Sequence, residues 1–163
     1  MTAAAAAARL AELTGAASHD VAVVLGSGWA SAADRLGVAE VELAFTALPG
    51  FLPPAVDGHA GRLRSIVVRG RRVLVLLGRT HLYEGRGTDA VVHGVRVAAA
   101  AGCRAVVLTN AAGAVREGLR VGQAVLVSDH LNLTACSPLT GARFVDLVDV
   151  GSYDQVIART AKR

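Results

Sequence analysis

The fold is decided by VLVLL at residues 73–77, an apolar run that leads directly into GRTHLYEG at residues 78–85. A continuous apolar run of this length indicates a strand buried on both faces, as in a parallel sheet. Side chains alternate along an extended segment, so Arg79, His81 and Tyr83 are expected to point the same way. Ligands of open α/β sheets bind beyond the carboxyl ends of strands. The stretch therefore predicts a site for an oxyanion such as phosphate, against the alternative of a polar loop with a surface ion pair.

A second buried run, DVAVVL at residues 20–25, is followed at once by GSG at residues 26–28. Glycines let backbone N–H groups approach a ligand closely, and Ser27 adds a hydroxyl, so this loop can cradle an anion. A dinucleotide fingerprint is excluded because Ser31 stands where its third glycine belongs, and no Gly-Lys-Ser/Thr follows to make a Walker A loop. Alone, the pattern is more typical of a tight turn.

The third transition from strand to loop runs from VVL at residues 106–108 into TNAAG at residues 109–113. The Asn110 amide can orient a ligand, and the Ala111 N–H can donate to an oxyanion. Asn and Gly are equally usual where a strand simply turns. Three strands that end in small polar loops form a stronger pattern than any one of them.

Five motifs occur in the order and spacing seen in trimeric purine nucleoside phosphorylases: GSG at 26–28, GH at 58–59, GRTHLYEG at 78–85, TNAAG at 109–113 and SDHLN at 128–132. The sequence resembles that family from about residue 20 to residue 149. The methylthioadenosine phosphorylases are a sister group that shares much of this pattern, so they stay the nearest alternative.

The resemblance implies a role for each motif. It places phosphate-binding groups at five positions: Ser27, His59, Arg79, His81 and Ala111, the last through its backbone N–H. Tyr83 would face the ribose, and Glu84 would support the phosphate site. Asn110 would act with His81 in catalysis, beside the phosphate and the sugar. No cofactor and no metal are implied, because inorganic phosphate is a co-substrate.

The implied activity is that of a pentosyltransferase in purine salvage. Phosphate would cleave the N-glycosidic bond of purine ribonucleosides and deoxyribonucleosides such as inosine and guanosine, giving the free base and (deoxy)ribose 1-phosphate. Because phosphate is the nucleophile, the protein has to hold a dianion in line and away from water. The resemblance further implies a cytoplasmic homotrimer, if full length, whose partners are a purine nucleoside and phosphate.

The family's purine-binding residues lie in a second half, whereas this sequence stops at Arg163. We therefore expect residues 1–163 to form a single α/β domain, the N-terminal portion of a nucleoside phosphorylase domain truncated at its C-terminal end. Two alternatives stay open: a catalytically inactive phosphate-binding fragment, and a methylthioadenosine phosphorylase. The choice between 6-oxo and 6-amino purines is open as well.

Composition agrees with a globular α/β piece, since 53% of the residues are hydrophobic and only 4% aromatic, so Val, Leu and Ala must build the core. The formal net charge of +4 comes without a nucleic-acid-binding motif. A solvated hairpin rim accounts for the arginine cluster: Arg62, Arg64, Arg69, Arg71 and Arg72. Cys103 and Cys136 lack metal-ligand spacing and favour reduced thiols in the cytoplasm. From the sequence we expect neither a secretion signal nor a membrane-spanning segment.

The periodicity predicts an α/β fold with a mixed, partly parallel central sheet flanked by helices. We expect helices over 3–15, 28–36 and 88–101, strands over 20–26, 39–45, 104–109 and 123–129, and a hairpin over 62–78. Thr88 is expected to cap the third helix and Gly102 to end it.

Overall fold

The computed structural model describes residues 2–53, 60–140, 153–154 and 157. It divides into two compact units, Met1–Ala112 and Gly113–Arg163, which are described separately. The single domain over residues 1–163 therefore stays a prediction. No helix among the described residues is long and apolar enough to cross a membrane.

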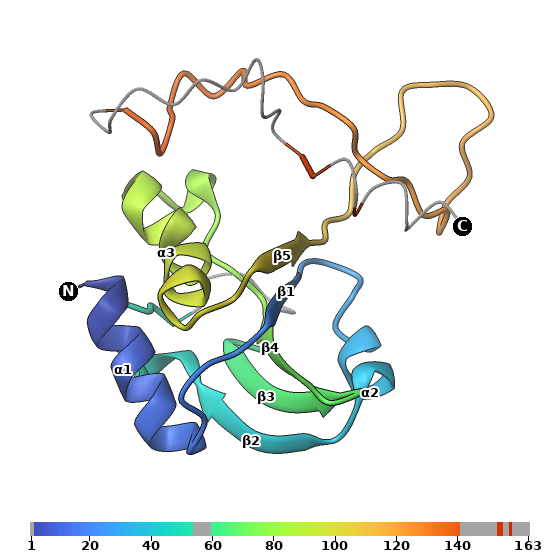
Figure 1. The fold of residues 1–163 in the computed structure, drawn as a ribbon. Helices are drawn as coiled ribbons and strands as arrows, with labels where there is room; N and C mark the ends of the chain where they lie inside the picture. Colours follow the sequence, from blue (N-terminus) through green and yellow to red (C-terminus); the bar gives the residue numbers. More distant parts are fainter. Residues whose placement is uncertain (1, 54–59, 141–152, 155–156, 158–163) are drawn as a thin grey trace. The chain divides into compact units, whose positions relative to one another are not determined.

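The first unit contains a five-stranded sheet with the order β2-β3-β4-β1-β5 (Figure 1). Its strands are β1 (Val21–Leu25), β2 (Ala39–Ala44), β3 (Arg62–Val68), β4 (Arg71–Leu77) and β5 (Ala105–Leu108). β1 lies between β4 and β5 and is parallel to both, whereas β2, β3 and β4 are antiparallel neighbours. The predicted mixed, partly parallel sheet is confirmed.

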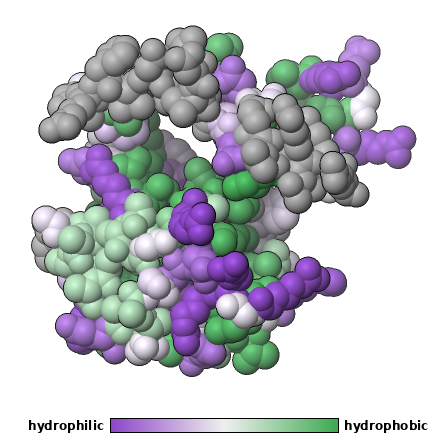
Figure 2. All heavy atoms as spheres, in the orientation of Figure 1, coloured by the Kyte–Doolittle hydropathy of each residue, from purple (hydrophilic) through white to green (hydrophobic). Residues whose placement is uncertain are grey.

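Helices cover both faces of this sheet. α1 (Ala3–Thr14) and α3 (Gly87–Ala100) pack together on one face, and α2 (Ala32–Leu36) lies on the other (Figure 1). The alanine-rich surface of α1 shows as pale green in Figure 2. α1 begins where the Thr2 hydroxyl accepts from the Ala5 N–H at 3.3 Å and ends at Gly15, whose φ of 66° only glycine adopts without strain.

β4 is buried on both faces of the sheet. Leu74 and Leu76 pack with α1 and α3, while Val75 and Leu77 pack with α2 on the opposite face. Leu74 and Val75 are both fully buried. The strand is therefore covered on both sides, as its unbroken apolar run predicts.

The β3–β4 hairpin turns at Arg69 and Gly70, with φ values of 50° and 76°. Two successive positive φ angles are typical of a two-residue turn that matches the twist of the strands. Ion pairs along this hairpin join Arg62 and Arg64 to Glu42, Arg64 also to Asp34, Arg71 to Asp20, and Arg72 to Glu40. The arginine cluster is thus largely neutralised within the rim.

Three local predictions are wrong. No strand forms at 123–129: residues 113–140, all described, contain none, and Val125, Leu126 and Val127 are exposed. An apolar segment without a neighbouring strand cannot pair its backbone N–H and C=O groups in a sheet, so the short apolar run alone is insufficient. α2 starts at Ala32 because Trp29 N–H and Ala32 N–H form turn hydrogen bonds first. α3 starts at Gly87 with Arg86 as its N-cap, so Thr88 is not the cap.

His19 is a buried histidine at the amino-terminal end of β1, away from the predicted site. Its side chain has 2% exposure, and Nε2 lies 2.9 Å from the hydroxyl of the fully buried Ser65. Burial, followed by the charge of Arg72, holds the pKa of His19 below its usual value of 6.5. The imidazole is therefore favoured as the neutral form in the folded chain.

We expect the first unit to lose stability as the pH falls below about 6.5, because the unfolded chain then takes up a proton that folded His19 resists. The contribution of this residue is at most about 1.4 kcal/mol per pH unit. His19→Gln, which keeps a donor toward Ser65, should flatten the dependence of Tm on pH between about 5 and 7, measured by circular dichroism. An unchanged slope in this variant would contradict the role of His19.

Candidate functional site

The site begins at the carboxyl ends of three neighbouring strands. Leu25 of β1 pairs with Leu77 of β4, and Val24 pairs with Leu108 of β5, so the three strands end at the same edge. The Gly78 N–H donates to the Leu25 carbonyl at 3.0 Å. The loops that start at residues 26, 78 and 109 are thereby brought together, as their motifs predict.

Thr109 ties two of these loops together. Its hydroxyl accepts from the Gly26 N–H at 2.9 Å and donates to the Val24 carbonyl at 3.1 Å. The first residue after β5 thus fixes the point where β1 turns into the GSG loop. In the sequence, only the place of Thr109 directly after a strand hints at this role.

Arg79 lies across the start of the GSG loop. Its Nη1 donates to the Thr109 carbonyl at 2.5 Å. A Cβ built on Gly26 would lie 2.5 Å from that carbonyl oxygen and 2.9 Å from Arg79 Nη1, so only glycine fits beneath the guanidinium. Burial lowers the pKa of the Arg79 guanidinium from its usual value, yet arginine stays charged in proteins. The arrangement fixes a half-buried cation beside Ser27.

The GRTHLYEG segment turns instead of staying extended. β4 ends at Leu77, and a 3₁₀ turn, η2, occupies Leu82–Glu84. The rings of His81 and Tyr83 still lie together, stacked with centroids 4.8 Å apart. Tyr83 is 74% exposed.

Glu84 organises this turn from within. Its side chain is 3% exposed, and Oε1 accepts from the His81 N–H at 2.7 Å and lies 3.3 Å from His81 Nδ1. The hydrogen bond from the His81 N–H is the main cause that holds the pKa of Glu84 below its usual value, and the imidazole and Arg86 add to it. Glu84 is therefore an anion that orients His81.

Asn110 and Ala111 follow Thr109 in the loop after β5 and are both exposed. The Asn110 carbonyl accepts from Trp29 Nε1–H at 3.1 Å, which links the loop after β5 to the loop after β1. Trp29 is the only tryptophan in the chain, so its fluorescence reports on this one place. The sequence motifs gave no indication of this contact between Trp29 and Asn110.

His59 falls outside the described residues. The nearest described position that is anchored is Gly61, whose N–H donates to the Leu77 carbonyl at 3.1 Å and whose carbonyl accepts from the Phe45 N–H at 2.7 Å. The structure describes the other seven of the eight proposed site residues. It brings Ser27, Arg79, Asn110 and Ala111 to the three strand ends, and gathers His81, Tyr83 and Glu84 on the turn after β4.

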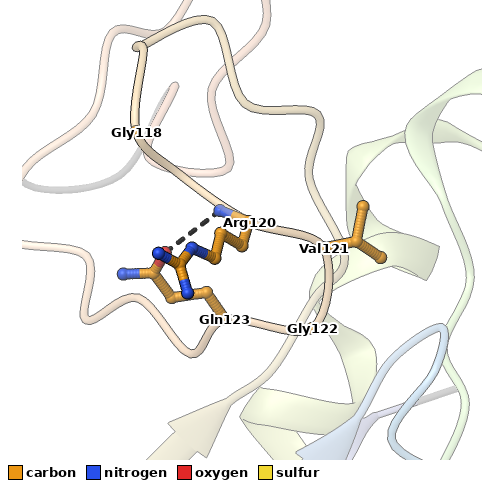
Figure 3. Close-up of a pocket in the computed structure, with 5 residues that line it drawn as sticks. All are labelled: Gly118, Arg120, Val121, Gly122 and Gln123. Atoms are coloured by element: carbon orange, nitrogen blue, oxygen red, sulfur yellow. Dashed lines mark hydrogen bonds between the residues drawn. The ribbon is translucent and has the colours of Figure 1, made fainter.

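Neither a metal centre nor the loop at residues 118–123 offers a comparable site among the described residues. The residues that the structure describes contain no group of three or more His, Cys, Asp or Glu able to hold a metal ion. In the second unit, one loop curls around a hollow lined by Gly118, Arg120, Val121, Gly122 and Gln123, where Gln123 Oε1 accepts from the Arg120 N–H at 3.1 Å (Figure 3). A single cation on one loop lacks the converging donors of the strand ends.

The fold is that of an α/β protein with the Arg79 cation where three strands end, and comparison assigns its family. The model of the phosphorylase superfamily matches residues 20–163, so the chain belongs to that superfamily. Within it the chain is 57% identical over 143 residues to the purine nucleoside phosphorylase of Mycobacterium tuberculosis, covering 88% of this chain and 53% of that protein. It is 52% identical over 157 residues to the Cellulomonas enzyme of the same name, covering 93% and 56%.

Solved structures agree with this assignment. A crystal structure of Schistosoma mansoni purine nucleoside phosphorylase in complex with acetate matches with a TM-score of 0.80 and 28% identity, over 99% of this chain and 63% of that one. The resemblance stated from the motifs is confirmed. The chain spans about half the length of the curated relatives that it matches.

Proposed function

We propose that this chain supplies the phosphate and ribose parts of the active site of a purine nucleoside phosphorylase. The observation that carries the proposal is the Arg79 guanidinium, which is fixed by the Thr109 carbonyl and lies over Gly26 where three strands end. A planar cation beside backbone N–H groups suits a phosphate dianion. The identity of 57% with a purine nucleoside phosphorylase points to the same chemistry.

In this mechanism a phosphate oxygen attacks the anomeric carbon of the sugar, and the N-glycosidic bond breaks with its electron pair leaving on the purine. Arg79, Ser27 and the Ala111 N–H would hold the dianion in line with the sugar, on the face opposite the base. As positive charge develops on the sugar, the bound dianion stabilises it. The protein thus needs no nucleophile of its own.

The remaining side chains would complete the phosphate and sugar contacts. His81, oriented by the Glu84 carboxylate, would donate to a phosphate oxygen, and His59 would approach the same anion. The exposed Tyr83 would cover the ribose, and Asn110 would lie beside phosphate and sugar. No cofactor or metal takes part in this scheme, since phosphate itself is the second substrate.

We assign the substrates as purine nucleosides such as inosine and guanosine, because the most similar relatives reported above are purine nucleoside phosphorylases. We propose a homotrimer in the cytoplasm, in line with the family that the motifs resemble. The two thiols of Cys103 and Cys136 are free, which fits a reducing compartment.

The reaction is tested by incubating the 163-residue chain with inosine, with and without phosphate, and measuring hypoxanthine and ribose 1-phosphate. We expect any cleavage to require phosphate, and ribose 1-phosphate to compete with phosphate for binding while free hypoxanthine does not. Hydrolysis at the same rate without phosphate would contradict a phosphorylase. A folded chain that binds phosphate and ribose 1-phosphate without cleaving inosine favours the alternative of a phosphate-binding part of the enzyme.

A further inference from the structure

Arg86 follows the GRTHLYEG motif and has no role in the scheme above, yet it contacts two elements at once. Its Nη1 donates to the Pro53 carbonyl at 2.8 Å, and its Nε lies 3.4 Å from Glu84 Oε2. Only 27% of its side chain is exposed. One guanidinium thus joins the turn that carries His81 to the proline-rich segment before residue 54.

The Glu84 carboxylate needs this cation. Its Oε1 is occupied by His81, while Oε2 is buried and accepts no hydrogen bond from any residue that the structure describes. A buried carboxylate oxygen without a donor is costly unless an opposite charge lies nearby. Arg86 is the arginine placed 3.4 Å from it.

The segment that carries the Pro53 carbonyl is itself held in place by α3. His93 lies about two turns further along, in α3. Its Nε2 is 2.9 Å from the Pro49 carbonyl oxygen, and its ring packs edge-on against Phe51 with ring centroids 4.9 Å apart. Gly50 is required there, because a Cβ would lie 2.7 Å from the His93 ring. His93 in the middle of α3 therefore holds the segment 49–53 at Pro49, and Arg86 at the start of α3 holds it at Pro53. The Pro53 carbonyl is thus a well-positioned acceptor for Arg86.

We propose that Arg86 is a positioning residue for phosphate binding: it joins the Pro53 carbonyl to the Glu84 carboxylate and thereby holds His81 in its place. The proposal rests on the proposed function, since the ligand is phosphate. Arg86 itself touches no substrate. It acts through Glu84, which orients the His81 N–H and ring.

The test compares Arg86→Gln with Arg96→Gln in the 163-residue chain. Arg96 lies on the same helix in an exposed pair with Asp89, so the control removes the same charge away from the turn. Phosphate affinity is measured by Trp29 fluorescence, and the titration midpoint of the Glu84 carboxyl by ¹³C NMR without phosphate. We expect Arg86→Gln to weaken phosphate binding about tenfold and to raise the Glu84 midpoint, and Arg96→Gln to do neither.

Two further variants exclude a general structural effect. Arg86→Lys keeps the charge, so it should recover the Glu84 midpoint and most of the affinity. In a Glu84→Gln background, Arg86→Gln should cost little more, because the two side chains act through one contact. Additive losses, or a loss of affinity with an unchanged Glu84 midpoint, would overturn the proposal.

The failure of this proposal is distinct from that of the proposed function. If the wild-type chain binds no phosphate, the proposed function fails, while the Glu84 midpoint still decides whether Arg86 controls the turn. If the wild type binds phosphate and Arg86→Gln behaves like Arg96→Gln in both measurements, only the positioning role is overturned.

Discussion

Arg79→Ala is expected to lower the phosphate affinity of the chain by at least about 100-fold, or about 2.7 kcal/mol. Arg79 supplies a half-buried charge whose direction is fixed by the Thr109 carbonyl, and charge-assisted hydrogen bonds are stronger in such surroundings than in water. Trp29 fluorescence or isothermal titration calorimetry with phosphate measures the effect.

Two variants serve as controls for Arg79→Ala. Arg79→Lys keeps a positive charge but not the planar fork, so an intermediate loss of about tenfold is expected. Arg71→Ala removes an exposed arginine from the opposite end of β4, where it pairs with Asp20, and should leave phosphate binding unchanged. Equal affinities of Arg79→Ala and Arg71→Ala would contradict a phosphate site at Arg79.

Gly26→Ala is expected to reduce phosphate affinity by at least about tenfold and the free energy of unfolding by about 1–3 kcal/mol. The new Cβ would lie 2.5 Å from the Thr109 carbonyl, so either the GSG loop or the end of β5 has to move, and the Arg79 acceptor moves with it. Gly26 is not among the glycines with positive φ, so the effect is steric. Urea unfolding and phosphate titration measure the two losses.

Gly70→Ala is the matched control for Gly26→Ala. Gly70 lies in the β3–β4 turn with a φ of 76° and open space around its Cα, so alanine costs backbone strain alone. We expect it to destabilise the fold by about 1 kcal/mol and to leave phosphate affinity unchanged. Loss of affinity in both variants in proportion to stability would indicate that Gly26 matters for folding only.

The strands at the site could be predicted because their continuous apolar runs indicate strands that are buried on both faces of a sheet. The run at residues 73–77 is buried on both faces, and its parallel neighbours end at the same edge, which brings Arg79 and Ser27 to one place. The same reasoning was wrong for residues 123–129, because the apolar run at residues 124–127 does not say whether a neighbouring strand pairs with it.

The contacts that fix the site were beyond sequence reasoning. Arg79 donates a hydrogen bond to the Thr109 carbonyl, which lies 30 residues away in the sequence. Arg86 donates to the Pro53 carbonyl, which lies 33 residues away. Such pairings depend on the exact course of loops. The extended segment expected after residue 77 is likewise replaced by a 3₁₀ turn, because the Glu84 carboxylate accepts from the His81 N–H three residues before it.

Titration of the ¹⁵N-labelled chain with inorganic phosphate tests most directly for an oxyanion site at the three strand ends. We expect saturable shifts of the backbone N–H signals of Gly26, Ser27, His81 and Ala111, and we expect these shifts to be lost in Arg79→Ala. Absence of shifts in a folded chain, or shifts confined to the Gly118–Gln123 loop, would contradict it.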